Sequence, residues 1–167
     1  YFETLSGRLS VKKTKKGYRM EFPVDMPRQV TPPAVLQEAF AGRLKHCFKA
    51  TDDFMVVLSS EGELAQLSPD IKAIAGLESR GLIITAPGDE TDFVSRCFFP
   101  RYGIDEDPVT GSAHTVLTPY WAARLGKSQL SARQISKRGG EIECKLEGGR
   151  VFLTGQAVTY LSGTIFI

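Results

Sequence analysis

The stretch Asp105-Glu106-Asp107-Pro108-Val109-Thr110-Gly111-Ser112-Ala113-His114 leads directly into the most apolar helical segment of the chain. Over about 112–126, apolar side chains cover most of the circumference of the predicted helix. A helix that is apolar nearly all round is buried inside a protein. Pro119 within it should free one backbone carbonyl or kink the helix, and Gly126 should end it. The sequence therefore predicts a core helix that starts directly after an acidic loop.

The segments on both sides of this helix are predicted to be short strands separated by turns. The expected strands are 4–11, 17–22, 44–50, 53–58, 81–86, 91–99, 129–136, 141–146, 150–154 and 157–167. Two further helices are expected, at about 33–41 and from Ser68-Pro69 to Gly76, and Asp52-Asp53 is expected to form a turn. The continuous apolar run 81–86 indicates a central strand. Short sequential strands favour antiparallel pairing, so we expect an α+β fold in which a curved, mostly antiparallel, barrel-like sheet wraps round the central buried helix.

Length and composition limit the class of protein. A chain of 167 residues with 42% hydrophobic residues fits a single domain, 1–167, and the net charge of +2 is too small to indicate a nucleic-acid partner. No segment has the length and apolarity of a membrane span. Three widely spaced cysteines indicate reduced thiols in a cytoplasmic protein, and the two histidines lack metal-ligand spacing. Because the chain starts at Tyr1, we expect it to be trimmed or part of a longer protein.

The start of the predicted helix offers groups that suit an anion. Gly111 lets a ligand approach the backbone, and the N–H groups of about 111–114 should be unpaired. Ser112 can cap the helix or donate its hydroxyl, and Asp107 can accept a hydrogen bond or pass a proton. These groups suit a small carboxylate or an enolate-like oxygen. The alternative is that Ser112 or Thr110 is only an N-cap and that the acids only complement the helix dipole; His114 is expected to be a hydrogen-bonded structural residue rather than a base.

The segment from Glu106 to His114, with Pro119-Tyr120-Trp121 and Leu125-Gly126-Lys127, resembles the signature of the PhzF-like family of phenazine-biosynthesis proteins. Three flanking motifs add to the resemblance, so that it covers essentially the whole chain. They are Thr4-Leu5-Ser6-Gly7, Asp92-Phe93-Val94-Ser95-Arg96 and Gln134-Ile135-Ser136-Lys137-Arg138-Gly139-Gly140.

The resemblance implies a diaminopimelate epimerase-like fold, in which two pseudo-symmetric domains each wrap a curved antiparallel sheet round a central helix. A small carboxylated substrate lies between the N-termini of the two helices, and the best-known member isomerises a dihydro-hydroxyanthranilate without a cofactor. Carried over by motif, Asp107 and Ser112 are the expected catalytic residues. The expected substrate-binding residues are Thr110, Gly111, Ser112 and Ala113.

The chain also departs from the family pattern. It resembles only the second domain; the general acid/base glutamate and a Gly-His motif belong to the first, N-terminal domain, with which the final strand 163–167 is expected to pair. A homodimer is expected by analogy. Thr110 stands where related epimerases have a catalytic cysteine, and a threonine hydroxyl is too weak an acid to replace a thiolate. We therefore expect a cofactor-independent isomerase; the alternative is a non-catalytic module that binds carboxylates or proteins.

Overall fold

The structure is a computed structural model that describes residues 1–4, 7–40 and 42–164. Within these ranges it contains twelve strands, four α-helices and one 3₁₀ helix. In chain order they are β1 Phe2–Thr4, β2 Gly7–Thr14, β3 Gly17–Pro23, β4 Arg28–Gln29, α1 Ala34–Phe40, β5 His46–Lys49, β6 Asp53–Val57, α2 Glu61–Ala65, α3 Ile71–Ala75, β7 Gly81–Pro87, β8 Phe93–Phe99, the 3₁₀ helix Pro100–Tyr102, β9 Ile104–Asp107, α4 Ala113–Leu125, β10 Gln129–Gln134, β11 Gly140–Glu147 and β12 Arg150–Gly155.

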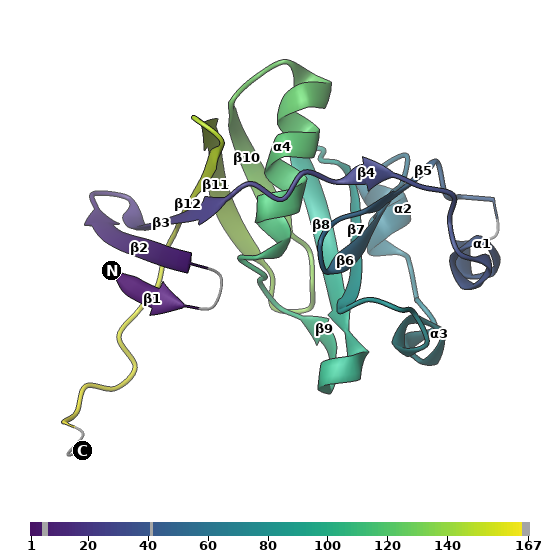
Figure 1. Ribbon diagram of the computed structural model, residues 1–167, viewed down its shortest axis with the longest axis horizontal. Coiled ribbons are helices and arrows are strands. Elements are labelled where there is room, and N and C mark those ends of the chain that lie inside the picture. Colours follow the sequence, from purple (N-terminus) through teal and green to yellow (C-terminus); the bar gives the residue numbers. More distant parts are fainter. Residues whose placement is uncertain (5–6, 41, 165–167) are drawn as a thin grey trace.

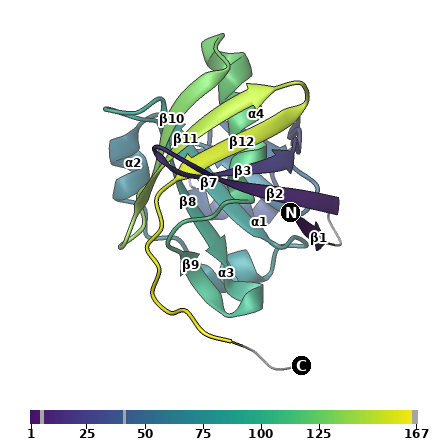
Figure 2. The same cartoon turned by 90° about the vertical axis from the view of Figure 1, so that its left-hand side faces the viewer.

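All strands belong to one strongly curved sheet. Its order is β1-β2-β3-β12-β11-β10-β8-β7-β6-β5-β4, and β9 pairs with β8 off this path. The sheet bends round α4 but remains open, with β1 and β4 as its edges (Figures 1 and 2). The predicted α+β class with a curved, mostly antiparallel sheet is confirmed. Two pairs, β6–β7 and β8–β10, are parallel instead. In each case helices lie between the two strands in the sequence and supply the crossover that parallel pairing needs.

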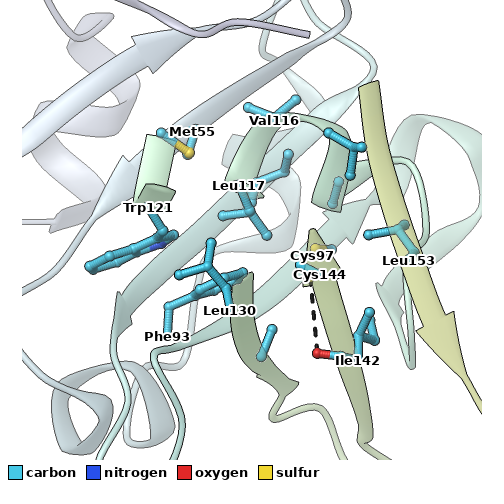
Figure 3. Close-up of a cluster of buried hydrophobic side chains, with 14 of the residues drawn as sticks. Met55, Phe93, Cys97, Val116, Leu117, Trp121, Leu130, Ile142, Cys144 and Leu153 are labelled. Carbon is cyan, nitrogen blue, oxygen red and sulfur yellow. Dashed lines mark hydrogen bonds between the residues drawn. The ribbon is translucent and has the colours of Figure 1, made fainter. Parts of the chain in front are cut away.

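Helix α4 forms the centre of the fold, as predicted. Trp121 and Leu117 are at most 1% exposed and belong to a core cluster that includes Phe93 from β8 and Leu130 from β10 (Figure 3). The rings of Trp121 and Phe93 stack at 5.7 Å, and the Trp121 indole N–H donates to Thr85 Oγ1 at 3.0 Å. Large apolar area and a satisfied indole group both stabilise this burial.

Pro119 leaves one carbonyl of α4 without its usual helical donor, and the fold supplies another. Proline has no N–H, so the carbonyl of Thr115, four residues earlier, loses its partner. The backbone N–H of Asp25 donates to this oxygen at 3.2 Å. The expected freed carbonyl is therefore present, and it ties the segment between β3 and β4 to the central helix. Gly126 ends α4 in the left-handed conformation at φ 68°, also as predicted.

A second layer covers the outer face of β6–β8. Helices α1, α2 and α3 lie on this side, away from α4 (Figure 1). Leu36, Leu64 and Ile74, one from each helix, join a core cluster with Leu82 and Ile84 of β7. The alternate residue of β7, Ile83, belongs instead to the cluster round α4. Strand β7 is therefore buried on both faces, which confirms its predicted central position.

Several expected elements differ in the structure. Helix α3 begins after an Asp70 cap rather than at Ser68-Pro69, and α2, capped by Ser60, was not expected. The expected strand 4–11 is divided between β1 and β2, with residues 5 and 6 outside the described residues. Residues 156–164 form no strand and run away from the sheet (Figure 1), and 165–167 lie outside the described residues. The pairing of 163–167 with another domain therefore stays a prediction.

The helices are short. In the ranges that the structure describes, none combines the length and the apolarity that crossing a membrane requires.

Candidate functional site

The candidate site lies where β9 leads into α4. Asp107 is the last residue of β9 and lies opposite Cys97 of the antiparallel strand β8. The acidic segment, expected to be a loop, is thus a strand up to Asp107. Pairing with β8 explains the difference. The hydrogen bonds between β8 and β9 satisfy backbone N–H and carbonyl groups that would be exposed to solvent in an acidic loop. The carboxylate is therefore attached to the sheet rather than to a free loop.

A buried amide and a hydroxyl hold Asp107 in place. Thr110 Oγ1 donates to Asp107 Oδ2 at 2.6 Å. Gln134 of β10, which is fully buried, donates through Nε2 to the Asp107 carbonyl at 2.5 Å and to Thr110 Oγ1 at 3.2 Å. Its Oε1 accepts the Thr110 N–H at 2.8 Å. Among the described residues, none bonds to Asp107 Oδ1, so this oxygen is available to a ligand.

Three backbone donors are available at the start of α4. The N–H groups of Gly111, Ser112 and Ala113 find no acceptor among the described residues. The fourth expected donor is not free: the His114 N–H donates to the Gly111 carbonyl at 3.0 Å. A Cβ atom placed on Gly111 would meet nothing within 4 Å, so the space in front of this backbone is open. Free donors at the positive end of a helix dipole suit an anionic oxygen.

Ser112 does not cap α4. Its hydroxyl makes no capping bond within the described part of the chain, and Oγ instead accepts a hydrogen bond from Arg80 Nη2 at 3.1 Å. Arg80 in turn forms a two-bond ion pair with Asp53, in which Nε lies 3.0 Å from Oδ1 and Nη2 contacts Oδ2. Asp53, expected in a turn, is the first residue of β6 and only 1% exposed. Its hydrogen bond raises the pKa of Arg80 above the ordinary value.

The expected capping role does not describe Thr110 either, because its hydroxyl is bonded to Asp107. Thr110 is 5% exposed, and both its hydroxyl and its N–H are engaged within the protein. The side chain of Ala113 is buried, so this residue offers only its N–H. The assignment of these two residues to substrate binding stays a prediction.

His114 is a buried structural residue, as expected. Its Nδ1 lies 2.7 Å from the Thr110 carbonyl, which can only accept, so Nδ1 carries the proton. Burial lowers the pKa of His114 to about 4, and the bond to Thr110 opposes this shift. Nε2 is buried and has no partner among the described residues. The buried ring therefore holds the Thr110 carbonyl toward the protein interior, in the segment between β9 and α4.

Cys97 lies behind the site and is not a nucleophile. It is fully buried, and this burial raises the pKa of its thiol. The hydrogen bond with Thr110 lowers the pKa, whereas the charges of Asp53 and Asp107 raise it further. The sulfur therefore stays a neutral thiol, and thiolate chemistry has no support at this junction.

Two side chains anchor the acidic segment to the rest of the fold. Arg96 donates to both carboxylate oxygens of Glu106, at 2.7 and 2.9 Å, and to the carbonyls of Leu64 and Leu67. On the other side, Ser136 Oγ donates to the Pro108 carbonyl at 2.8 Å. Beside these anchors is a hollow of about 410 Å³, lined by Glu106, Pro108, Ser136, Lys137 and Arg138.

The structure thus brings together all the predicted site residues and adds three that sequence reasoning missed. Asp53, Arg80 and Gln134 come from β6, the residue before β7, and β10. The sequence does contain a signal for Asp53 and Arg80, because each is a charged residue at the start of an apolar strand or directly before it. They meet because β6 and β7 run parallel with Asp53 opposite Gly81.

The chain thus has an α+β fold in which a curved, open sheet surrounds a buried helix, and the free N–H groups of that helix face an open space beside a carboxylate. The chain belongs to the phenazine biosynthesis-like protein family, whose pattern it matches over residues 1–163.

Relatives and solved structures agree with this membership. An uncharacterized isomerase of Pseudomonas aeruginosa is 46% identical over 166 residues, which cover 99% of this chain and 64% of the relative. The phenazine biosynthesis-like domain-containing protein 2 of Mus musculus is 38% identical, with 98% and 64% covered. A crystal structure of a phenazine biosynthesis protein of the PhzF family from Enterococcus faecalis superposes with a TM-score of 0.89 at 38% identity, covering 99% of this chain and 64% of that one. The chain thus spans 64% of the length of these relatives.

Proposed function

We propose that the protein is a cofactor-independent isomerase that moves a proton on a small carboxylated substrate, and that this chain, as a second domain, supplies one wall of the active-site cleft. The observation that carries the proposal is the set of three free N–H groups at Gly111, Ser112 and Ala113. The names of relatives such as the uncharacterized isomerases of Pseudomonas aeruginosa and Halalkalibacterium halodurans support the reaction class.

In this proposal the helix start binds the substrate carboxylate. When a proton leaves a carbon conjugated with that group, negative charge moves onto the carboxylate oxygens, and the same donors stabilise it. The proton then returns at another carbon, so no electrons are gained or lost. Asp107 uses its free Oδ1 to orient a substrate hydroxyl or amine or to relay the proton, while Thr110 holds Oδ2. A glutamate from the domain that faces this wall moves the proton.

The test uses substitutions that leave the fold intact. Gly111→Ala adds a methyl group that meets no protein atom within 4 Å, so it should obstruct only a ligand. Gly62→Ala on the exposed side of α2, where the added methyl group would make only an ordinary contact with Ser60 Oγ at 3.9 Å, is the matched control. Solvent deuterium incorporation into cyclic or unsaturated carboxylates is measured with protein that contains both domains. We expect Ser112→Ala to lower exchange roughly 100-fold, as loss of one anion-stabilising donor does. Gly111→Ala should also lower exchange, because the added methyl group obstructs the ligand. Unchanged exchange in both Asp107→Ala and Ser112→Ala would contradict the assigned roles.

A second candidate function is carboxylate binding without turnover. It is favoured by the contacts of Glu106, the glutamate in the segment that leads into α4. Both carboxylate oxygens of Glu106 accept from Arg96, so this glutamate is not free to move a proton. The same experiment separates the two functions. Carboxylate binding at the amides of residues 111–113 without deuterium incorporation, in protein with both domains, indicates the binding module.

A further inference from the structure

We propose that Arg80 is a positioning residue of the carboxylate site: held by the buried Asp53, it directs the hydroxyl hydrogen of Ser112 to the substrate carboxylate. This inference rests on the proposed carboxylate site and deepens it, because it gives a role to two residues that lie outside the junction of β9 and α4. It also makes the Ser112 hydroxyl a fourth donor beside the three backbone N–H groups.

The direction of one hydrogen bond decides the orientation of the hydroxyl. A guanidinium group only donates, so at the 3.1 Å contact with Arg80 Nη2 the Ser112 oxygen is the acceptor. The hydroxyl hydrogen must then point elsewhere, and it finds no acceptor among the described residues. Ser112 is half-buried, so a ligand oxygen can reach this hydrogen. A serine that capped its own helix would have its oxygen engaged by the helix N–H groups instead.

Arg80 itself is held in one orientation. Asp53, at 1% exposure, accepts from both Nε and Nη2, which is the fork geometry that only arginine offers. The Arg80 backbone N–H donates to the Asp52 carbonyl at 2.8 Å, and its guanidinium carbon lies 5.2 Å from the centre of the Phe99 ring. These contacts place Nη2 at Ser112 without help from a ligand.

The ion pair also determines how Arg80 acts. Because the carboxylate of Asp53 compensates its charge at contact distance, Arg80 adds little net field at the helix start. Its contribution to carboxylate binding therefore depends on its hydrogen bond to Ser112. A lysine at this position keeps the charge but lacks the rigid planar fork whose Nε and Nη2 hold Asp53 while Nη2 reaches Ser112. Arg80→Lys should thus remove the positioning and preserve the charge.

The experiment uses protein that contains both domains and measures benzoate binding by the shifts of the amide signals of Gly111, Ser112 and Ala113 in the ¹H–¹⁵N spectrum. We expect Ser112→Ala and Arg80→Lys each to raise the Kd for benzoate roughly tenfold, the effect of one hydrogen bond to a charged group. The double variant should bind no more weakly than Ser112→Ala alone, because both changes remove the same donor.

The matched control is Arg101→Lys. The guanidinium of Arg101 is likewise held by hydrogen bonds, to the carbonyls of Leu77 and Ser79, but neither of these partners belongs to the site. This variant should keep the wild-type Kd. Thermal unfolding of each variant separates a loss of binding from a loss of stability, since a merely structural role of Arg80 would lower the melting temperature and leave the Kd of the folded protein unchanged.

The outcomes separate this inference from the proposed function. If benzoate shifts none of the three amides in wild-type protein that contains both domains, the carboxylate site itself is refuted. If Ser112→Ala weakens binding and Arg80→Lys does not, only the role of Arg80 is refuted. A further loss in the double variant also overturns it, because Arg80 would then contribute to binding by a route that does not pass through the Ser112 hydroxyl. Should Arg80→Lys fail to fold, Asp53→Asn replaces it: one accepting oxygen is lost, a higher Kd is expected, and an unchanged Kd contradicts the proposal.

Discussion

The neutral state of buried His114 predicts a specific pH dependence of stability. In the folded protein the imidazole remains neutral down to its lowered pKa of about 4. In the unfolded chain the same group takes up a proton at its ordinary pKa of about 6.5. As pH falls below about 6.5, His114 therefore becomes protonated in the unfolded state but stays neutral in the folded state, and the free energy of unfolding decreases. Above that pH both states are neutral and the contribution vanishes.

The two pKa values fix the size of the effect. Linkage gives a loss of about 2 kcal/mol at pH 5 and about 3 kcal/mol at pH 4, relative to pH 7.5. Urea unfolding of the wild type and of His114→Gln at these three pH values measures it. The glutamine stays neutral and can still donate to the Thr110 carbonyl, so the variant lacks this loss. Titration of the carboxyl groups contributes equally to both proteins and cancels in their difference.

One outcome of the comparison between wild type and His114→Gln would contradict the prediction. Equal pH slopes for wild type and His114→Gln between pH 7.5 and 4 would mean that His114 is protonated in the folded protein. His46→Gln is the control, because His46 is the other histidine of the chain and lies half-buried on β5, away from the site. A difference in pH slope that is confined to His114→Gln assigns the effect to the buried ring.

Substitutions at three further positions test the supports of the site and the core. Arg96→Gln should lower the free energy of unfolding by about 2–3 kcal/mol, measured in urea, because Glu106 loses a partly buried two-bond partner; Arg96→Lys should cost less. Gly81→Ala should cost about 1–3 kcal/mol by the same assay, because its Cβ would lie 2.3 Å from the Phe98 carbonyl oxygen. Leu117→Ala, in the core of α4, should cost about 2–5 kcal/mol, and a loss below 1 kcal/mol would contradict its packing.

Much of the fold could be predicted because it depends on local patterns. The apolar circumference of 112–126 identified a buried helix, Gly126 identified its end, and Pro119 identified a carbonyl that needs another donor. The run 81–86 identified the central strand. The short elements were missed: α2 has 5 residues and β4 has 2, too few for a periodicity to be visible. Strand β9 was missed because its acids resemble a loop until β8 supplies a partner.

The sequence alone determined the helix start and its chemistry. A glycine, a serine and a nearby acid before a buried helix are adjacent in the chain, so their proximity needs no knowledge of the fold. Only the tertiary structure decided what supports them. Gln134 reaches Thr110 because β10 lies parallel to β8, and Asp53 reaches Arg80 because β6 lies parallel to β7. Alternation of side chains identifies a strand but does not name its neighbour, and these contacts depend on the neighbour.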